Sequence, residues 1–283
     1  MQQKLREFWR QSMTARIARQ FDAHIDFLHV RLDPADMAAA MASSGAVMVP
    51  AGMVDGWERD AAAREARALA QFERLAATLG LTRADTPAGA AGPTAQWHRV
   101  VGREPFWLAE YGRTVDLLVV ARPNGNDGVL PETLEAALLD SGRPLLIPGS
   151  EPGGTPATGP FETVAVAWKS SPSAARAVAA AVPFLAGAER IAVLAVAEDE
   201  APDAVGAERL AAALRWRGPE VTLHQLEPSP EGVGETLIAA ARGQGAALLV
   251  MGDYGHSRLR EFVFGGVTRS VLRAADLPVL LAH

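Results

Sequence analysis

Short apolar runs alternate with amphipathic stretches through the second half of the chain. The runs are almost wholly apolar, which is typical of strands buried on both faces of a sheet. Leucine and alanine recur at helical spacing between them. The expected elements are strand Val164–Trp168, helix Ser173–Leu185, strand Ile191–Ala197, helix Asp203–Arg217, strand Val221–Leu226, helix Val233–Gly243, strand Ala246–Met251, helix Val267–Ala275 and strand Pro278–Ala282. This alternation predicts a parallel α/β sheet flanked by helices.

The first half repeats the pattern incompletely, so the two halves read as diverged copies of one unit. Its expected elements are strand Ala23–Val30, helix Glu58–Leu79, strand Gln96–Val101, helix Phe106–Gly112, strand Asp116–Ala121 and a closing strand at Pro144–Pro148. No apolar strand comes before the first of these, because Met1–Gln20 reads as helix throughout. The first copy therefore lacks a clear first strand.

A stretch rich in Gly, Pro, Ser and Thr, Gly149–Pro160, separates the halves and is typical of a linker. With 283 residues the chain is long enough for two cores. The predicted division is a degenerate domain at 1–149, a linker at 150–160 and a complete domain at 161–283.

Composition narrows the class of protein. Apolar residues make up 49% of the chain and charged residues 21%, as in soluble globular proteins. A net charge of −6 argues against a nucleic-acid partner. No apolar run is long enough to span a bilayer, and the N-terminus lacks the features of a secretory signal, so a cytoplasmic protein without a membrane partner is expected. The absence of cysteine excludes disulfides and thiolate chemistry.

The remaining chemistry is sparse. The six histidines give no metal-binding set, because His24 and His29 are expected on opposite faces of one strand. His98 and His224 fit half-buried strand positions. No catalytic triad, P-loop or paired carboxylates are recognisable, so the sequence predicts no enzyme.

One segment does suggest a ligand. Gly252, Gly255 and Gly265 lie between a buried strand and a helix start. Glycine permits positive φ and close approach of a ligand to peptide N–H groups, and a helix N-terminus suits phosphate. The structural alternative is that Gly252 and Gly255 permit a sharp exit from the strand and that Gly265–Gly266 allow close helix packing.

The spacing of glycine, two residues, glycine, nine residues and glycine resembles the nucleotide-binding pattern of the universal stress protein family. The order of elements extends the resemblance over the second half, and more loosely over the first, as in a tandem member. The resemblance implies two open parallel-sheet domains of the adenine nucleotide alpha hydrolase-like fold, with strand order 3-2-1-4-5. It also implies that the halves form an intramolecular pseudo-dimer, for which the closing strands Pro144–Pro148 and Pro278–Ala282 are candidates.

In such a fold the first strand is central, so its absence would leave a gap in the first domain. Either the N-terminal helix takes its place, or the start of the gene has been lost or misassigned.

The resemblance also implies a site for ATP, with Mg if ATP is bound. Its candidate residues here are Gly252, Gly255, Gly265, Gly266, Val267, Thr268 and Lys169. Two positions depart from the family pattern, which has Ser or Thr at 266 and an aspartate at 169.

Lysine cannot accept hydrogen bonds from a nucleoside, so Lys169 is either a phosphate contact or an exposed loop lysine. Thr268 either replaces the missing hydroxyl or caps the helix.

Three hypotheses follow. The first is a non-enzymatic stress-response protein that binds ATP or a related adenine nucleotide in its second domain. The second is a member that binds no nucleotide and acts through dimerisation, a homodimer included, and protein partners. The third, an ATP-hydrolysing enzyme, is the weakest because no base or metal ligand is evident.

Overall fold

The computed structural model describes residues 13–43, 52–86, 92–122, 131–149, 159–197, 204–253 and 265–283. These residues fall into two compact units, one formed by Thr14–Tyr111 and one that contains Gly112–His283. None of the helices among them combines the length and the apolar character that crossing a bilayer requires.

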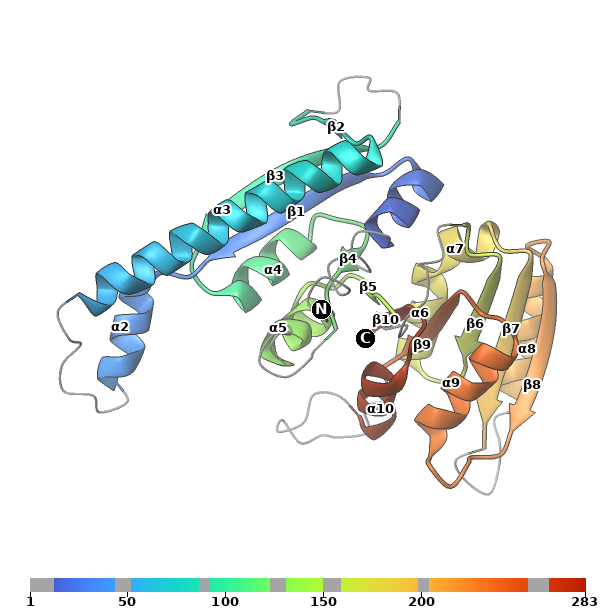
Figure 1. Ribbon diagram of the computed structural model, residues 1–283. Helices are drawn as coiled ribbons and strands as arrows, with labels where there is room; N and C mark the ends of the chain where they lie inside the picture. The colour runs from blue at the N-terminus through green and yellow to red at the C-terminus, as the bar shows by residue number, and fades with distance from the viewer. Residues whose placement is uncertain are drawn as a thin grey trace. The chain divides into compact units, whose positions relative to one another are not determined.

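The unit that contains Gly112–His283 is built on a seven-stranded sheet (Figure 1). Its order is β4 (Leu118–Val119), β5 (Leu145–Ile147), β10 (Val279–Ala282), β9 (Leu248–Gly252), β6 (Thr163–Ala167), β7 (Arg190–Val196) and β8 (Glu220–Leu226). The last five strands of the chain follow the order 3-2-1-4-5, and all pair in parallel. The predicted α/β fold and strand order of the second half are confirmed.

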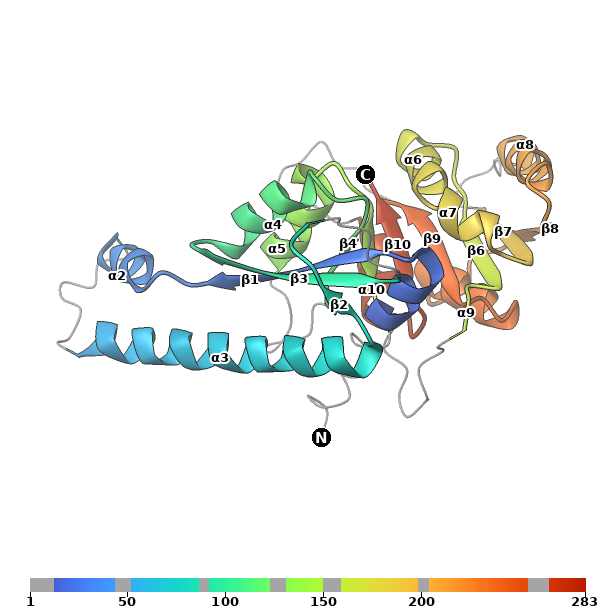
Figure 2. The ribbon, with the colours of Figure 1, turned by 90° about the horizontal axis from the view of Figure 1, so that it is seen from above.

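Helices cover both faces of this part of the sheet. α6 (Pro172–Ala180), α7 (Val182–Ala186) and α8 (Ala204–Arg215) lie on one face, and α9 (Val233–Gly243) and α10 (Gly266–Ala274) on the other (Figure 2). Every residue of β6 and β9 is buried, as their apolar sequences predicted. The helix expected at Ser173–Leu185 is divided at Ala181, because Pro183 at the start of α7 has no N–H to donate.

The two closing strands pair with each other in an antiparallel register. Leu280 lies opposite Leu146, with Val279 opposite Ile147 and Leu281 opposite Leu145. All six of these side chains are fully buried. The predicted contact between the closing strands is therefore present within a single chain. A helix not predicted from the sequence, α5 (Pro131–Glu135), continues as a π-helical stretch at Ala136–Asp140 between β4 and β5.

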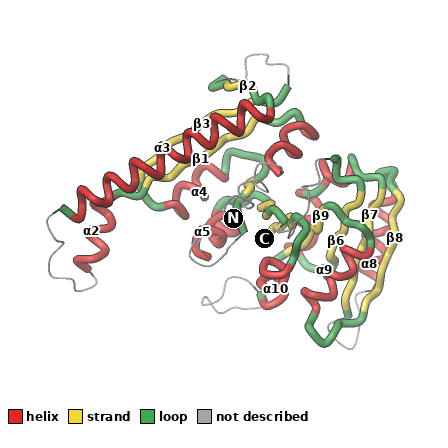
Figure 3. Tube along the Cα trace, in the orientation of Figure 1, coloured by secondary structure: helices red, strands yellow, loops and turns green. Residues whose placement is uncertain are grey.

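The unit Thr14–Tyr111 has its own parallel sheet, in the order β1 (His24–Arg31), β3 (Thr94–Val101) and β2 (Thr82–Arg83). The long helix α3 (Met53–Leu79) covers one face, and α4 (Glu104–Gly112) runs beside the other (Figure 2). α3 ends at Gly80, whose φ of 67° forms a left-handed cap. A helix at residues 13–21 precedes β1, and α2 (Pro34–Ser43) follows it; Figure 3 shows these helices and strands by type.

An apolar cluster holds α3 on this sheet. Phe72 and Ala76 from α3 pack with Ala95 of β3 and Ala18 of the preceding helix. Phe27 and Trp97, which lie opposite each other in the β1–β3 register, pack against the same cluster. The apolar stripe predicted on this helix is the face that it buries.

The missing first strand explains why the first half is divided between two units. In the second half, β6 pairs with β7 on one side and with β9 on the other, so it joins the two parts of the sheet. Among the residues described for the first half, no strand takes that place, and β4 and β5 are added to the sheet of the second half through β10. The compact units therefore do not divide at the linker. The division into inherited halves at 1–149 and 161–283 stays a prediction.

Candidate functional site

The predicted site lies at the carboxyl ends of β6 and β9. The direction in which strands are added to the sheet reverses between these neighbours. From β6 the chain adds β7 and β8 on one side, and it then adds β9 and β10 on the other side of β6. Open α/β sheets bind ligands at such a switch point. The helix that follows β6, α6, and the helix that follows β9, α10, both begin near this edge (Figure 1).

The segment after β6 provides a cation and a capped helix. Lys169 is half-buried rather than exposed, which is contrary to the simplest expectation for a loop lysine. The Ser171 hydroxyl accepts a hydrogen bond from the Ala174 N–H at 3.1 Å and so caps α6, and Pro172 takes the first turn. The Trp168 indole nitrogen is buried and has no hydrogen-bond acceptor among the described residues.

Gly252 is required for packing. A Cβ at this position would lie 2.4 Å from the Ala174 nitrogen, so the end of β9 approaches the first turn of α6 at backbone distance. Gly252 is not among the glycines with positive φ, so conformational freedom is not its role. Gly255 and the nine-residue spacer after it lie outside the described residues.

Asp253, the residue after Gly252, was not predicted to belong to the site. Its carboxylate is buried, with a side chain 4% exposed. Oδ1 accepts a hydrogen bond from the Thr268 hydroxyl at 3.2 Å, and Oδ2 lies 3.5 Å from Nδ1 of His283. The Asp253 carbonyl accepts a hydrogen bond from Ser173 Oγ at 3.0 Å, which joins the strand end to α6. Its place between Gly252 and Gly255 was the one sequence feature that could have indicated a role for Asp253 in the site.

The start of α10 carries the other candidate residues. Gly265 is the N-cap, with φ −58° and ψ 159°, and it offers no side-chain hydrogen bond. A Cβ on Gly266 would meet nothing within 4 Å, so this glycine serves neither close packing nor positive φ. Val267 is half-buried. Thr268 is fully buried in the first turn and bonds Asp253, so the prediction that it caps the helix is wrong.

The charges at this edge are mixed. The N-termini of α6 and α10 present backbone N–H groups and the positive ends of two helix dipoles, which favour an anion. Lys169 adds a positive charge at the same edge, whereas Asp253 places a negative charge within hydrogen-bond reach of α10. The edge therefore suits a ligand with hydrogen-bond donors as well as an anionic group.

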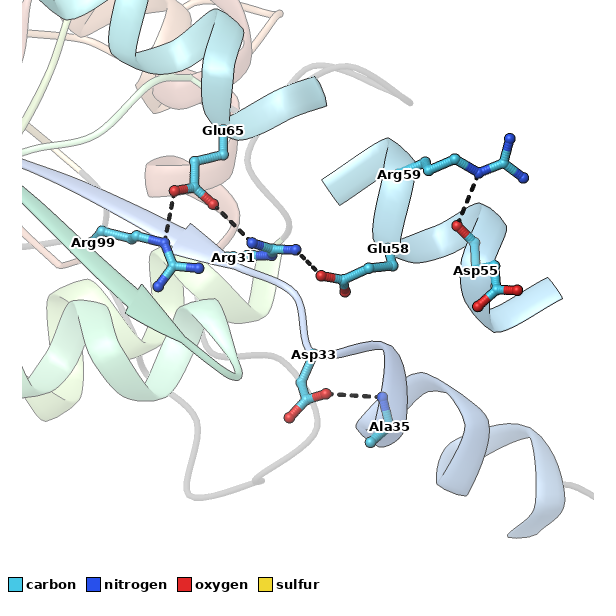
Figure 4. A network of polar contacts seen from close by, with 8 residues as sticks. All are labelled: Arg31, Asp33, Ala35, Asp55, Glu58, Arg59, Glu65 and Arg99. Atoms are coloured by element: carbon cyan, nitrogen blue, oxygen red, sulfur yellow. Dashed lines mark hydrogen bonds and ion pairs between the residues drawn. The ribbon is translucent and has the colours of Figure 1, made fainter. Parts of the chain in front are cut away.

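A second polar cluster lies in the other unit, between α3 and the ends of β1 and β3 (Figure 4). Glu65 bonds Arg99 at 2.7 Å and Arg31 at 3.2 Å, and Arg31 also pairs with Glu58. Burial alone would raise the pKa of Glu65, but the hydrogen bond from Arg99 and the two arginine charges hold it below its ordinary value. These ion pairs join a helix to a sheet and present no ligand-binding arrangement.

The histidines of this unit have structural partners. His98 Nε2 lies 2.8 Å from Asp26 Oδ1, and His24 Nε2 lies 3.2 Å from the same oxygen. His98 is half-buried on its strand, as predicted. Burial lowers the pKa of His29, whose ring stacks on Trp97. In the part of the chain that the structure describes, no three acidic or histidine side chains are grouped so as to hold a metal ion.

Comparisons with known proteins agree with this architecture. Residues 160–283 match the Universal stress protein family. A universal stress protein from Archaeoglobus fulgidus DSM 4304 is 16% identical, with a TM-score of 0.67 over 98% of this chain and 90% of that chain. A search of the curated proteins found no match.

Two further structures align less closely. A putative universal stress protein from Pseudomonas aeruginosa UCBPP-PA14 has 12% identity and a TM-score of 0.45, over 95% of this chain and 94% of that chain. A universal stress protein in complex with cAMP has 24% identity and a TM-score of 0.34, over 44% of this chain and 99% of that chain.

Proposed function

We propose, because residues 160–283 match the Universal stress protein family, that the second domain binds ATP or a related adenine nucleotide. The protein would be a cytoplasmic stress-response protein and not an enzyme. The observation that carries the proposal is the meeting of two helix N-termini, those of α6 and α10, at the switch point of a parallel sheet.

Each described part of the site has a role in this proposal. The first turn of α10, from Gly266 to Thr268, would offer N–H groups to a phosphate. Lys169 would supply a positive charge to the same ligand. Mg²⁺ would be bound mainly through the phosphates of the nucleotide, as this ion commonly is.

Calorimetry of the full-length protein with MgATP tests the proposal, together with chromatography of any nucleotide released from the purified protein. Gly265→Leu should abolish binding and spare the fold, because a bulky side chain would stand where phosphate approaches α10. Gly243→Leu is the matched control, since a Cβ on Gly243 in α9 would meet nothing within 4 Å. A folded protein that binds no nucleotide at millimolar ATP would refute nucleotide binding.

A second candidate function rests on Asp253. A buried carboxylate that is hydrogen-bonded to the first turn of α10 opposes phosphate there, which favours a member that binds no nucleotide and acts through dimerisation and protein partners. The antiparallel pairing of β5 and β10 gives such a member a paired arrangement within one chain. Light scattering of the full-length protein would establish whether a homodimer forms as well.

A further inference from the structure

The carboxylate of Asp253 is fixed in place by both its side chain and its backbone. Thr268 donates to Oδ1 at 3.2 Å, and the His283 ring lies 3.5 Å from Oδ2. The Asp253 N–H donates to the Ala282 carbonyl at 2.9 Å, and its own carbonyl accepts from Ser173 at 3.0 Å. With a side chain only 4% exposed, this negative charge is shielded from water and cannot be moved aside cheaply.

The same carboxylate lies beside the helix end that would receive phosphate. Thr268, its hydrogen-bond partner, is the third residue of α10. Gly265, the N-cap, contributes no side-chain acceptor, whereas the Asp253 carboxylate is hydrogen-bonded to Thr268 in this turn and Glu235 bonds Ser270 further along the helix. A negative charge near a helix N-terminus is stabilised by the dipole, and it repels a second anion that approaches the same helix end.

Ligands of different charge should therefore be treated differently. A triphosphate brings several negative charges toward a buried carboxylate, and like charges repel strongly where water is excluded. A carboxylate also accepts hydrogen bonds, which ribose hydroxyls and an adenine amine can donate. Lys169, just after β6, and Arg269, in the first turn of α10, offer positive charge at this edge, and the Asp253 carboxylate offsets part of it.

We propose, on the basis of the proposed function, that Asp253 is a specificity residue. It makes this site select adenine ligands of low charge, adenosine or adenosine monophosphate, over ATP.

Calorimetry of the full-length protein with adenosine, adenosine monophosphate and ATP in one buffer tests this. The wild type should bind adenosine at least as tightly as ATP. Asp253→Asn keeps the shape and removes the charge, so the affinity for ATP should rise about tenfold while that for adenosine stays level or falls. Glu208→Gln, on the exposed face of α8, removes one negative charge elsewhere in the domain and should leave both affinities unchanged.

The order of the wild-type affinities for adenosine and ATP can be measured without any variant. If Asp253→Asn does not fold, Asp253→Ser is a second replacement that removes the charge. The proposal is overturned if the wild type binds ATP tenfold more tightly than adenosine, or if Asp253→Asn leaves the ratio of the two affinities unchanged.

Its failure can be distinguished from failure of the proposed function. Preferential ATP binding by the wild type would keep the function and reject the role of Asp253. If the wild type bound none of the three ligands and Asp253→Asn bound ATP, the proposed function would be rejected, and so would selection of adenosine, while Asp253 would still be shown to exclude ATP. No binding of any ligand to either protein would reject both.

Discussion

Two glycines of the candidate site differ in what a side chain would meet. At Gly252 a Cβ would lie 2.4 Å from the backbone nitrogen of Ala174, whereas at Gly266 it would meet nothing within 4 Å. Neither glycine has a positive φ, so the two differ only in the room available for a side chain. The glycine motif therefore combines a glycine needed for packing, Gly252, with one that the fold does not require, Gly266.

Alanine at these two positions should move stability in opposite directions. We expect Gly266→Ala to stabilise the protein by about 0.4–1 kcal/mol, because it restricts the unfolded chain at no steric cost. Gly252→Ala should destabilise it by about 1–3 kcal/mol, because β9 and α6 must move apart. Chemical denaturation of both variants measures this, and equal effects would contradict the packing role of Gly252.

Arg122 is a buried arginine that nothing in the sequence singled out. Only 8% of it is exposed, and its guanidinium donates to the Leu272 carbonyl at 2.5 Å and to the Pro148 carbonyl at 3.2 Å. Burial lowers its pKa to about 10, so it stays charged at neutral pH. It joins the segment after β4 to the end of α10.

We expect Arg122→Met to cost on the order of 2–3 kcal/mol of unfolding free energy, because two buried carbonyls lose a charged donor. Arg217→Met, at an exposed position after α8, is the control and should stay within about 0.5 kcal/mol of the wild type. If thermal or chemical denaturation gave both variants the same stability, Arg122 would have no structural role.

At the scale of elements, the attachment of α3 to its sheet combines an apolar cluster with the ion pairs of Figure 4. Two groups in this contact titrate in acid. Glu65 has a pKa below its ordinary 4.5, and it contributes stability that is present above that value and lost as pH falls through the lower folded pKa. Burial lowers the pKa of His29 below 6.5, so its contribution declines as pH falls below 6.5.

Both shifts predict that α3 loosens in acid. Amide hydrogen exchange in α3 should accelerate between neutral pH and about pH 3, beyond the intrinsic effect of pH. In Glu65→Gln the part of this change below the ordinary carboxylate pKa should be missing, because glutamine does not titrate. Exchange in α8, which lies in the other unit, is the internal control. An α3 protection that does not vary with pH would contradict the assigned role of Glu65.

Much of the second half could be predicted because its strands are buried on both faces and so carry uninterrupted apolar runs. β8 differs by one residue from its prediction, and α9 has the predicted bounds. The break at Ala181 was missed because helix continues on both sides of it, although Pro183 was a signal for the break in the sequence. α2 and the helix at Pro131–Glu135 were missed because neither shows a clear apolar stripe.

At the scale of the whole molecule, the sequence indicated a missing strand but not its consequence. Where β4 and β5 go depends on the free edge of β10, which is distant in sequence and becomes available only once the second half has folded. The position of the site could be predicted from the strand ends and helix starts, but the charge at the site could not. The sign of that charge depends on Asp253, whose burial follows from the contact between β9, α6 and α10.

The pairing of β5 with β10 predicts the assembly of a shortened chain. Without β4 and β5, residues 159–283 would expose the edge of β10, including Leu280 and Leu281, which are fully buried in the full-length protein. An apolar free edge tends to pair with another copy. We expect residues 159–283 to form a dimer through β10, and residues 112–283, which retain β4 and β5, to form none through that edge. Light scattering after size-exclusion chromatography measures both, and a monomeric 159–283 would show that β5 does not occupy an edge with affinity for a second copy.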